Sequence, residues 1–185
     1  MAFNFSHCQS LILHGILEGL RLRADKIAAI EKVPNVEFPV SGVSLDLVPW
    51  HGALGVSLRL CTEFEAEIRN CNVEWAYFDL VSNTNCPRLQ LAADFVHKAY
   101  TSEDSNSTAP EMAHLIFLAG AEALLDPRVA QLLVELGINA PTYRDSFPSP
   151  LFEYMVFDFD RTVSANYCEI VLANRVTAKW WPRLV

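Results

Sequence analysis

Apolar residues near the start of the chain recur at three- and four-residue steps, which is the pattern of one helical face. They are Leu13, Ile16, Leu17, Leu20, Ala24, Ile27 and Ile30. Ser6 and Gln9 have the spacing of a capping box, so the pattern predicts a helix from Ser6 to Ile30. Pro34 then marks the beginning of a loop.

The next part of the chain alternates between apolar and polar residues, which predicts strands with one buried and one solvated face. Val43, Leu45 and Leu47 alternate with Ser44 and Asp46. A turn is expected at residues 49–52, followed by a long strand over residues 56–69. Residues 74–81 are rich in aromatic side chains and predict a third strand.

The middle of the chain has the signals of three helices. Asn85 is expected to cap the first, which continues to Tyr100. Residues 108–111 (TAPE) have the form of a second capping box. The third helix is expected to begin at Asp126-Pro127 and to end at Gly137.

Two strands are predicted at the end, over residues 152–163 and 167–177, joined by a hairpin-sized connection at residues 164–166. The element order is then α-βββ-ααα-ββ. Strands grouped in runs favour an α+β fold. We therefore expect one domain over residues 1–185, with helices packed on an antiparallel sheet of about five strands.

Composition narrows the function classes. The chain has 185 residues, a formal net charge of −8 and a sequence pI of about 5.0. This excess of acidic residues is the opposite of the basic surface that nucleic-acid-binding proteins present. No signal peptide and no membrane span is recognised, and the five cysteines are odd in number and widely spaced. These features predict a cytoplasmic protein with reduced thiols.

One segment carries a candidate catalytic motif. In MVFDFDRTV (residues 155–163), Asp158 and Asp160 project from the same side of a predicted strand, where two carboxylates can share a divalent cation. The segment resembles the first motif of haloacid-dehalogenase-type phosphatases. The resemblance implies that Asp158 attacks phosphorus and that Asp160 handles protons, both beside magnesium.

The context of this motif differs from the phosphatase pattern. That family places the motif on the first strand of a parallel sheet and follows it with a loop and a helix. Here it lies near the end of the given sequence and leads into a predicted hairpin. We interpret Asp158 and Asp160 as part of a solvated strand face. A metal-dependent phosphohydrolase that uses them is the alternative.

Other catalytic or metal-binding motifs are missing from the sequence. It has no Cys-x-x-Cys, no His-Glu-x-x-His and no Gly-x-Ser-x-Gly, and no glycine-rich loop precedes a predicted helix. We predict no catalytic residue, no metal and no cofactor.

Acidic residues gather on one predicted strand. Alternation places Glu63, Glu65 and Glu67 on the same side, with Asp46 close across the hairpin. Like charges at this spacing repel, and a basic partner would relieve that repulsion. Trp50, in the predicted turn, is a candidate anchor. In the alternative interpretation, these glutamates are a solvated face that guards a sheet edge.

The size, the acidity, the segment LVPWHGALGVSLRL followed by an aromatic strand, and the terminal hairpin resemble the immunity proteins of bacterial polymorphic-toxin and contact-dependent inhibition systems. The resemblance implies a stoichiometric inhibitor that binds a cognate toxin. The leading prediction is therefore a non-enzymatic protein that binds a basic toxin domain through Glu63, Glu65, Glu67, Asp46 and Trp50. A structural subunit of a homo-oligomer is a third interpretation.

Overall fold

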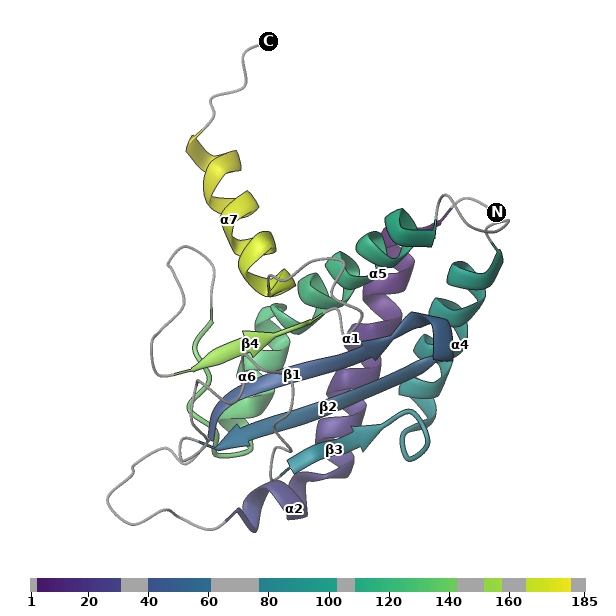
Figure 1. Ribbon diagram of the computed structural model, residues 1–185. Coiled ribbons are helices and arrows are strands. Elements are labelled where there is room, and N and C mark those ends of the chain that lie inside the picture. Colours follow the sequence, from purple (N-terminus) through teal and green to yellow (C-terminus); the bar gives the residue numbers. More distant parts are fainter. Residues whose placement is uncertain are drawn as a thin grey trace.

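Helices pack against one face of a four-stranded mixed sheet (Figure 1). The computed structural model describes residues 3–30, 40–60, 77–102, 109–142, 152–157 and 166–180. The elements are α1 (Phe5–Leu22), α2 (Ala24–Ala28), β1 (Val40–Val48), the 3-10 helix η1 (Pro49–His51), β2 (Ala53–Leu60), β3 (Tyr77–Ser82), α4 (Pro87–Ser102), α5 (Ala109–Leu124), α6 (Pro127–Glu135), β4 (Glu153–Met155) and α7 (Tyr167–Trp180). The predicted α+β class is confirmed. None of the described helices combines the length and the hydropathy needed to cross a bilayer.

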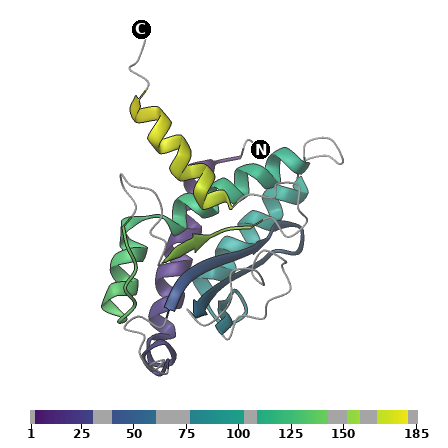
Figure 2. The same ribbon diagram turned by 60° about the vertical axis from the view of Figure 1, so that its left-hand side comes forward.

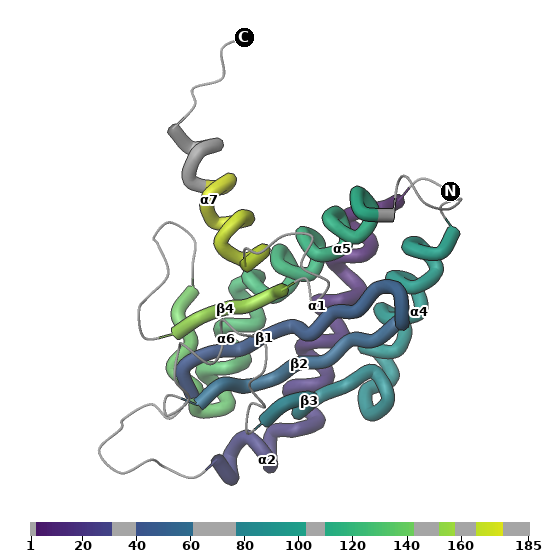
Figure 3. The backbone as a smooth tube through the Cα atoms, in the orientation of Figure 1, coloured from purple at the N-terminus to yellow at the C-terminus, as the bar shows by residue number. Residues whose placement is uncertain are grey.

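The strands β1 and β2 form the predicted hairpin. They pair antiparallel from Val48 opposite Ala53 to Val40 opposite Leu60, and η1 forms the turn between them. Gly52 closes this turn with a φ of 60°, a backbone conformation that favours glycine. The tip of the hairpin lies against α4, as the chain path in Figure 3 shows.

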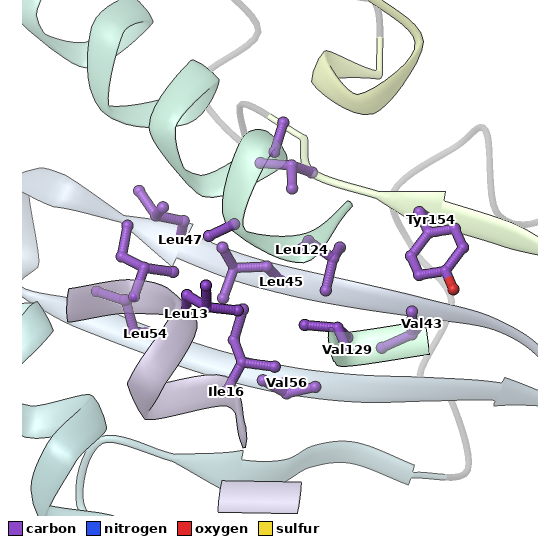
Figure 4. Close-up of a cluster of buried hydrophobic side chains, with 14 of the residues drawn as sticks. Leu13, Ile16, Val43, Leu45, Leu47, Leu54, Val56, Leu124, Val129 and Tyr154 are labelled. Atoms are coloured by element: carbon purple, nitrogen blue, oxygen red, sulfur yellow. The ribbon is translucent and has the colours of Figure 1, made fainter. Parts of the chain in front are cut away.

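The core lies between the sheet and the helices, and the predicted alternation places it there. Figure 4 shows Leu45 and Val56 of the sheet packed near Leu13 and Ile16 of α1. On α5, Gly120 lets the helix approach closely, because a Cβ there would lie 3.0 Å from the side chains of both Leu45 and Leu47. The apolar residues of β1 therefore face the helices and form the buried side that the alternation predicts.

The first helix differs from its prediction at both ends. Its N-cap is Asn4, whose side chain accepts a hydrogen bond from the backbone N–H of His7 at 3.0 Å, so the predicted cap at Ser6 is wrong. The helix also breaks at Arg23, which separates α1 from α2. At this break the Arg23 guanidinium donates to the backbone oxygen of Leu80 in β3, a contact that an unbroken helix pattern does not reveal.

The signals around the middle helices have mixed outcomes. Asn85 lies in the turn before α4, where its side chain accepts from the backbone N–H of Ser82, and the helix begins later, at Pro87. The predicted cap residue Thr108 lies outside the described residues. The signals of α6 are confirmed, because the Asp126 side chain accepts from the N–H of Arg128 and Gly137 has a φ of 87° after the last turn.

Replacing Asp126 with alanine is expected to lower the free energy of unfolding by about 1 kcal/mol at pH 7, because the cap is lost. A hydrogen bond from the Arg128 side chain lowers the pKa of Asp126. The lowered pKa means that this stability is present above the ordinary pKa and is lost as the pH falls through the folded value. Urea unfolding at pH 7 and pH 2.5 measures it. If the natural protein and Asp126→Ala differ in free energy of unfolding by the same amount at both pH values, this role is contradicted.

The C-terminal part of the fold corrects two predictions. The strand β4 pairs with β1 in parallel, with Gly42 opposite Glu153, so the sheet is mixed and has four described strands, not five antiparallel ones. The second predicted strand of the terminal hairpin is the helix α7. It begins against α5 and leads away from the sheet (Figures 1 and 2).

Asn166 explains why a helix follows β4. Its side-chain oxygen accepts from the backbone N–H groups of Val156 and Cys168, and its amide donates to the backbone oxygen of Tyr154. These bonds join the end of β4 to the first turn of α7. Tyr167 and Val171 are buried four residues apart, which is helical spacing. The apolar residues of this segment therefore follow the helix period, although they also fit the alternation of a strand.

Candidate functional site

The sheet face that points away from the helices is built from small and polar residues. In the β1–β2 register, Asp46 lies opposite Gly55 and Ser44 lies opposite Ser57. Asp46 stands between two leucines that face the helices, so alternation turns it to the other side. This face is the one toward the viewer in Figure 1, where the helices pass behind the sheet.

Asp46 is held by two serine hydroxyl groups. Its carboxylate accepts a hydrogen bond from the Ser44 hydroxyl at 2.6 Å and another from the Ser57 hydroxyl. Ser57 is fully buried and Ser44 is 4% exposed, so the prediction that Ser44 lies on a solvated face is wrong. This part of the face is therefore less open to solvent than alternation alone indicates.

A second aspartate, Asp79 of β3, lies beside the first. Its backbone N–H donates to the Ser57 hydroxyl at 3.0 Å, so a single serine links the two acidic residues. The φ of Asp79 is 48°, which is uncommon for a residue other than glycine, and the β2–β3 register shifts between Val56 and Leu58. This irregularity turns the Asp79 side chain over β2.

Gly55 provides the space for that side chain. A Cβ at this position would lie only 2.3 Å from Oδ1 of Asp79. Any larger residue at position 55 would therefore displace the Asp79 carboxylate.

The two aspartates share an open cavity of about 420 Å³. Its lining is Asp46, Val48, Ala53, Leu54, Gly55, Phe78, Asp79, Ser82, Asn83 and Thr84. Phe78 is 55% exposed, so the cavity combines acidic groups with an aromatic ring that is open to a partner.

Burial changes the protonation of both carboxyl groups. It raises the pKa of Asp46 to about 6, the charge of Asp79 adds to this rise, and the hydrogen bonds from Ser44 and Ser57 oppose it. Burial also raises the pKa of Asp79. The cavity therefore gathers negative charge near neutral pH at some cost in free energy.

Arg59, on the same face of β2, has other partners. Its guanidinium donates to the carboxylate of Glu153 at 2.7 Å and to the hydroxyl of Ser41 at 3.0 Å. It also donates to the backbone oxygen of Ser41 at 3.1 Å. Arg59 thus holds β4 against the sheet, and its charge is balanced by Glu153 and does not serve the cavity.

The cavity contains only part of the predicted binding set. Asp46 lies in it, whereas Trp50 lies in η1, with its ring 6.2 Å from that of Tyr100 in α4. The three predicted glutamates Glu63, Glu65 and Glu67 lie outside the described residues, and so do Asp158 and Asp160 of the phosphatase-like motif.

Sequence reasoning missed Phe78, Asp79 and Ser57. A signal for Asp79 was present, since it interrupts an otherwise apolar strand in YFDLV. An acidic residue within a buried strand needs a hydrogen-bond partner or a function. The serine that joins the two aspartates had no comparable signal.

Metal and thiol chemistry gain no support from the described part of the chain. There, no three histidine, cysteine or acidic residues are grouped so that they could hold a metal ion. Cys8 and Cys168 are buried, and burial raises the pKa of the Cys8 thiol to about 12 and that of Cys168 well above its ordinary value. Such thiols stay protonated at neutral pH and are poor nucleophiles.

Comparison with models of protein families, with curated proteins and with solved structures gave no significant match.

Proposed function

We propose that this protein is a non-enzymatic binding protein for a basic protein domain, and that the Asp46–Asp79 cavity receives one of the cationic side chains of that domain. The observation that carries this proposal is that two carboxylates share one open cavity while Arg59, on the same face, is balanced by Glu153. An immunity-type inhibitor of a basic toxin domain is the class of protein that fits best.

The energetics of the cavity favour a cationic ligand. Keeping Asp46 ionised in a partly buried site is unfavourable, and Asp79 adds repulsion. A guanidinium or ammonium group would offset the repulsion between the two carboxylates and provide donors to the more accessible one, Asp79. The net charge of −8 would also steer a basic partner toward the protein.

Phe78 supports a protein as the partner. Its exposed ring lies at the cavity, where it can contact the apolar stem of a lysine or arginine or stack on a guanidinium group. Exposed aromatic residues beside charged groups are frequent anchors of protein interfaces.

The hydrogen bonds of Asp46 support binding more than acid–base catalysis. A general acid or base must present an oxygen to the substrate. In Asp46 one oxygen accepts from Ser44 and the other from Ser57, both within the sheet. The more accessible oxygens belong to Asp79, which suits contact with a charged group of a partner.

The test is capture of the partner on the immobilised protein from a lysate of the source organism, at low and at high salt. We expect one basic protein, retained at close to one-to-one ratio and released by salt. Asp79→Asn and Phe78→Ser should each weaken its binding roughly tenfold or more. Reversal of Glu63, Glu65 and Glu67 tests whether the site extends to the predicted acidic face.

Asp94→Asn is the matched control. Asp94 is exposed on α4, in the helix layer, and its replacement changes the net charge by the same amount as Asp79→Asn. Binding should remain unchanged in this variant. An equal loss in Asp94→Asn and Asp79→Asn would reject the cavity as the site and leave only a general effect of charge. Failure to retain any basic protein would count against the function itself.

A further inference from the structure

The geometry of the cavity couples the binding of a cation to the binding of a proton, an inference that rests on the proposed function. We propose that the Asp46–Asp79 cavity binds a cationic group in exchange for a proton, so that the partner is held at neutral pH and released under mildly acidic conditions. Near and below pH 6, where Asp46 is largely protonated, the proton leaves its carboxyl oxygen for solvent when the cation enters. At pH 7.5 the carboxylate is already ionised and the cation binds without releasing a proton.

The two serines allow Asp46 to exist in either protonation state. A hydroxyl group donates one hydrogen bond and accepts others, and it can rotate. With Asp46 ionised, the hydroxyls of Ser44 and Ser57 both donate to the carboxylate. With Asp46 protonated, either serine hydroxyl can turn and accept a hydrogen bond from the carboxyl O–H of Asp46. No side chain has to move, so the site can bind and lose a proton without unfolding.

The groups that face Asp46 from each neighbouring element show which of them can change its pKa. On its own strand, Ser44 is neutral. The strand β2 contributes the neutral Ser57 and the charged Arg59. The Arg59 guanidinium forms an ion pair with Glu153 of β4. The following turn contributes the neutral Asn83 and Thr84 to the lining.

Asp79 of β3 is therefore the described charged group that raises the pKa of Asp46 by repulsion.

The expected size of the effect follows from the ionised fraction. With a pKa of about 6, Asp46 is almost fully ionised at pH 7.5 and about one-tenth ionised at pH 5. A ligand that binds only the ionised form loses apparent affinity in proportion to that fraction. Affinity should therefore fall about tenfold between pH 7.5 and pH 5.

The experiment uses the full chain and the peptide acetyl-Arg-Arg-Arg-amide as the cationic probe. Carbon-detected NMR of the aspartate carboxyl groups first follows the titration of the free protein. Peptide titrations at pH 7.5 and pH 5 then give the two affinities. We expect Asp46 to titrate near pH 6, a lower midpoint in Asp79→Asn, and about tenfold weaker peptide binding at pH 5.

Two variants separate the linkage from general charge effects. Asp46→Asn should bind the peptide more weakly at pH 7.5 and should lose most of the pH dependence. Asp94→Asn, the exposed control on α4, should keep the pH dependence of the natural protein.

Two of the other outcomes would overturn the proton linkage alone, and a third would overturn the cationic site as well. Equal affinity at both pH values, with localised peptide shifts at Asp79, would overturn the proton linkage and leave the binding function standing. A titration of Asp46 near pH 4 would do the same. Absence of peptide binding at both pH values would overturn the linkage and the cationic site together, even if Asp46 titrates near pH 6.

Discussion

Asp46→Asn is expected to make the folded protein more stable at pH 7, by roughly 3 kcal/mol. The folded-state pKa of Asp46 is raised to about 6, so the folded protein holds this proton more tightly than the unfolded chain does. Above pH 6 the ionised carboxylate therefore lowers the free energy of unfolding, and each pKa unit corresponds to about 1.4 kcal/mol. Asparagine keeps the shape but has no charge. Its side-chain oxygen can accept from one serine, and its NH2 group can donate to the other serine, whose hydroxyl turns to accept.

The pH dependence tests the sign of this effect. In the natural protein, the contribution of Asp46 to stability is largest below pH 4, falls as the pH rises from 4 to 6, and is constant above that. The advantage of Asp46→Asn should therefore be present at pH 7 and disappear at pH 4. Urea unfolding at both pH values measures it, and Asp94→Asn is the exposed control.

A less stable Asp46→Asn variant at pH 7 would mean that the carboxylate is needed to organise the two serines. The combination that we expect, greater stability with weaker partner binding, would instead indicate a charge that is retained for function. Perturbed acidic groups in cavities are often of this kind, because binding sites give up some stability for their ligands.

Asn166→Ala is expected to lower the free energy of unfolding by roughly 3 kcal/mol. Asn166 is 6% exposed, and alanine would leave the N–H groups of Val156 and Cys168 and the oxygen of Tyr154 without this partner. Each buried polar group that loses its hydrogen bond costs about 1–3 kcal/mol. Because these bonds join β4 to α7, amide protons at this junction should also exchange faster than those of α1.

Lys98→Ala is the control, since Lys98 is exposed on α4. It should change the free energy of unfolding by no more than about 0.5 kcal/mol. Denaturant unfolding of both variants measures the difference. If both variants lose equally little stability, the Asn166 bonds do not hold β4 to α7.

Local signals determine the parts of this fold that lie within one or two turns of chain. The ends of α6 could be read from Asp126 and Gly137, because capping and a left-handed backbone act on adjacent residues. The apolar face of β1 could be read from alternation, since the direction of side chains in a strand has a period of two. The function class inferred from acidity stays a prediction.

Contacts between distant segments determine the rest. The apolar residues of α7 suited a strand as well as a helix, and hydrogen bonds from Asn166 to the backbone of β4 favour the helix. The parallel pairing of β4 with β1 joins segments far apart in the chain, so no local pattern predicts it.

The cavity has the same origin. Asp46 and Asp79 belong to strands that do not pair with each other, and they meet only because Ser57 of the strand between them bonds to both. In the sequence, Asp46 is a polar position of an alternating strand, and Asp79 interrupts an apolar one. Their proximity and their raised pKa values depend on strand pairing and on burial, which are properties of the assembled sheet.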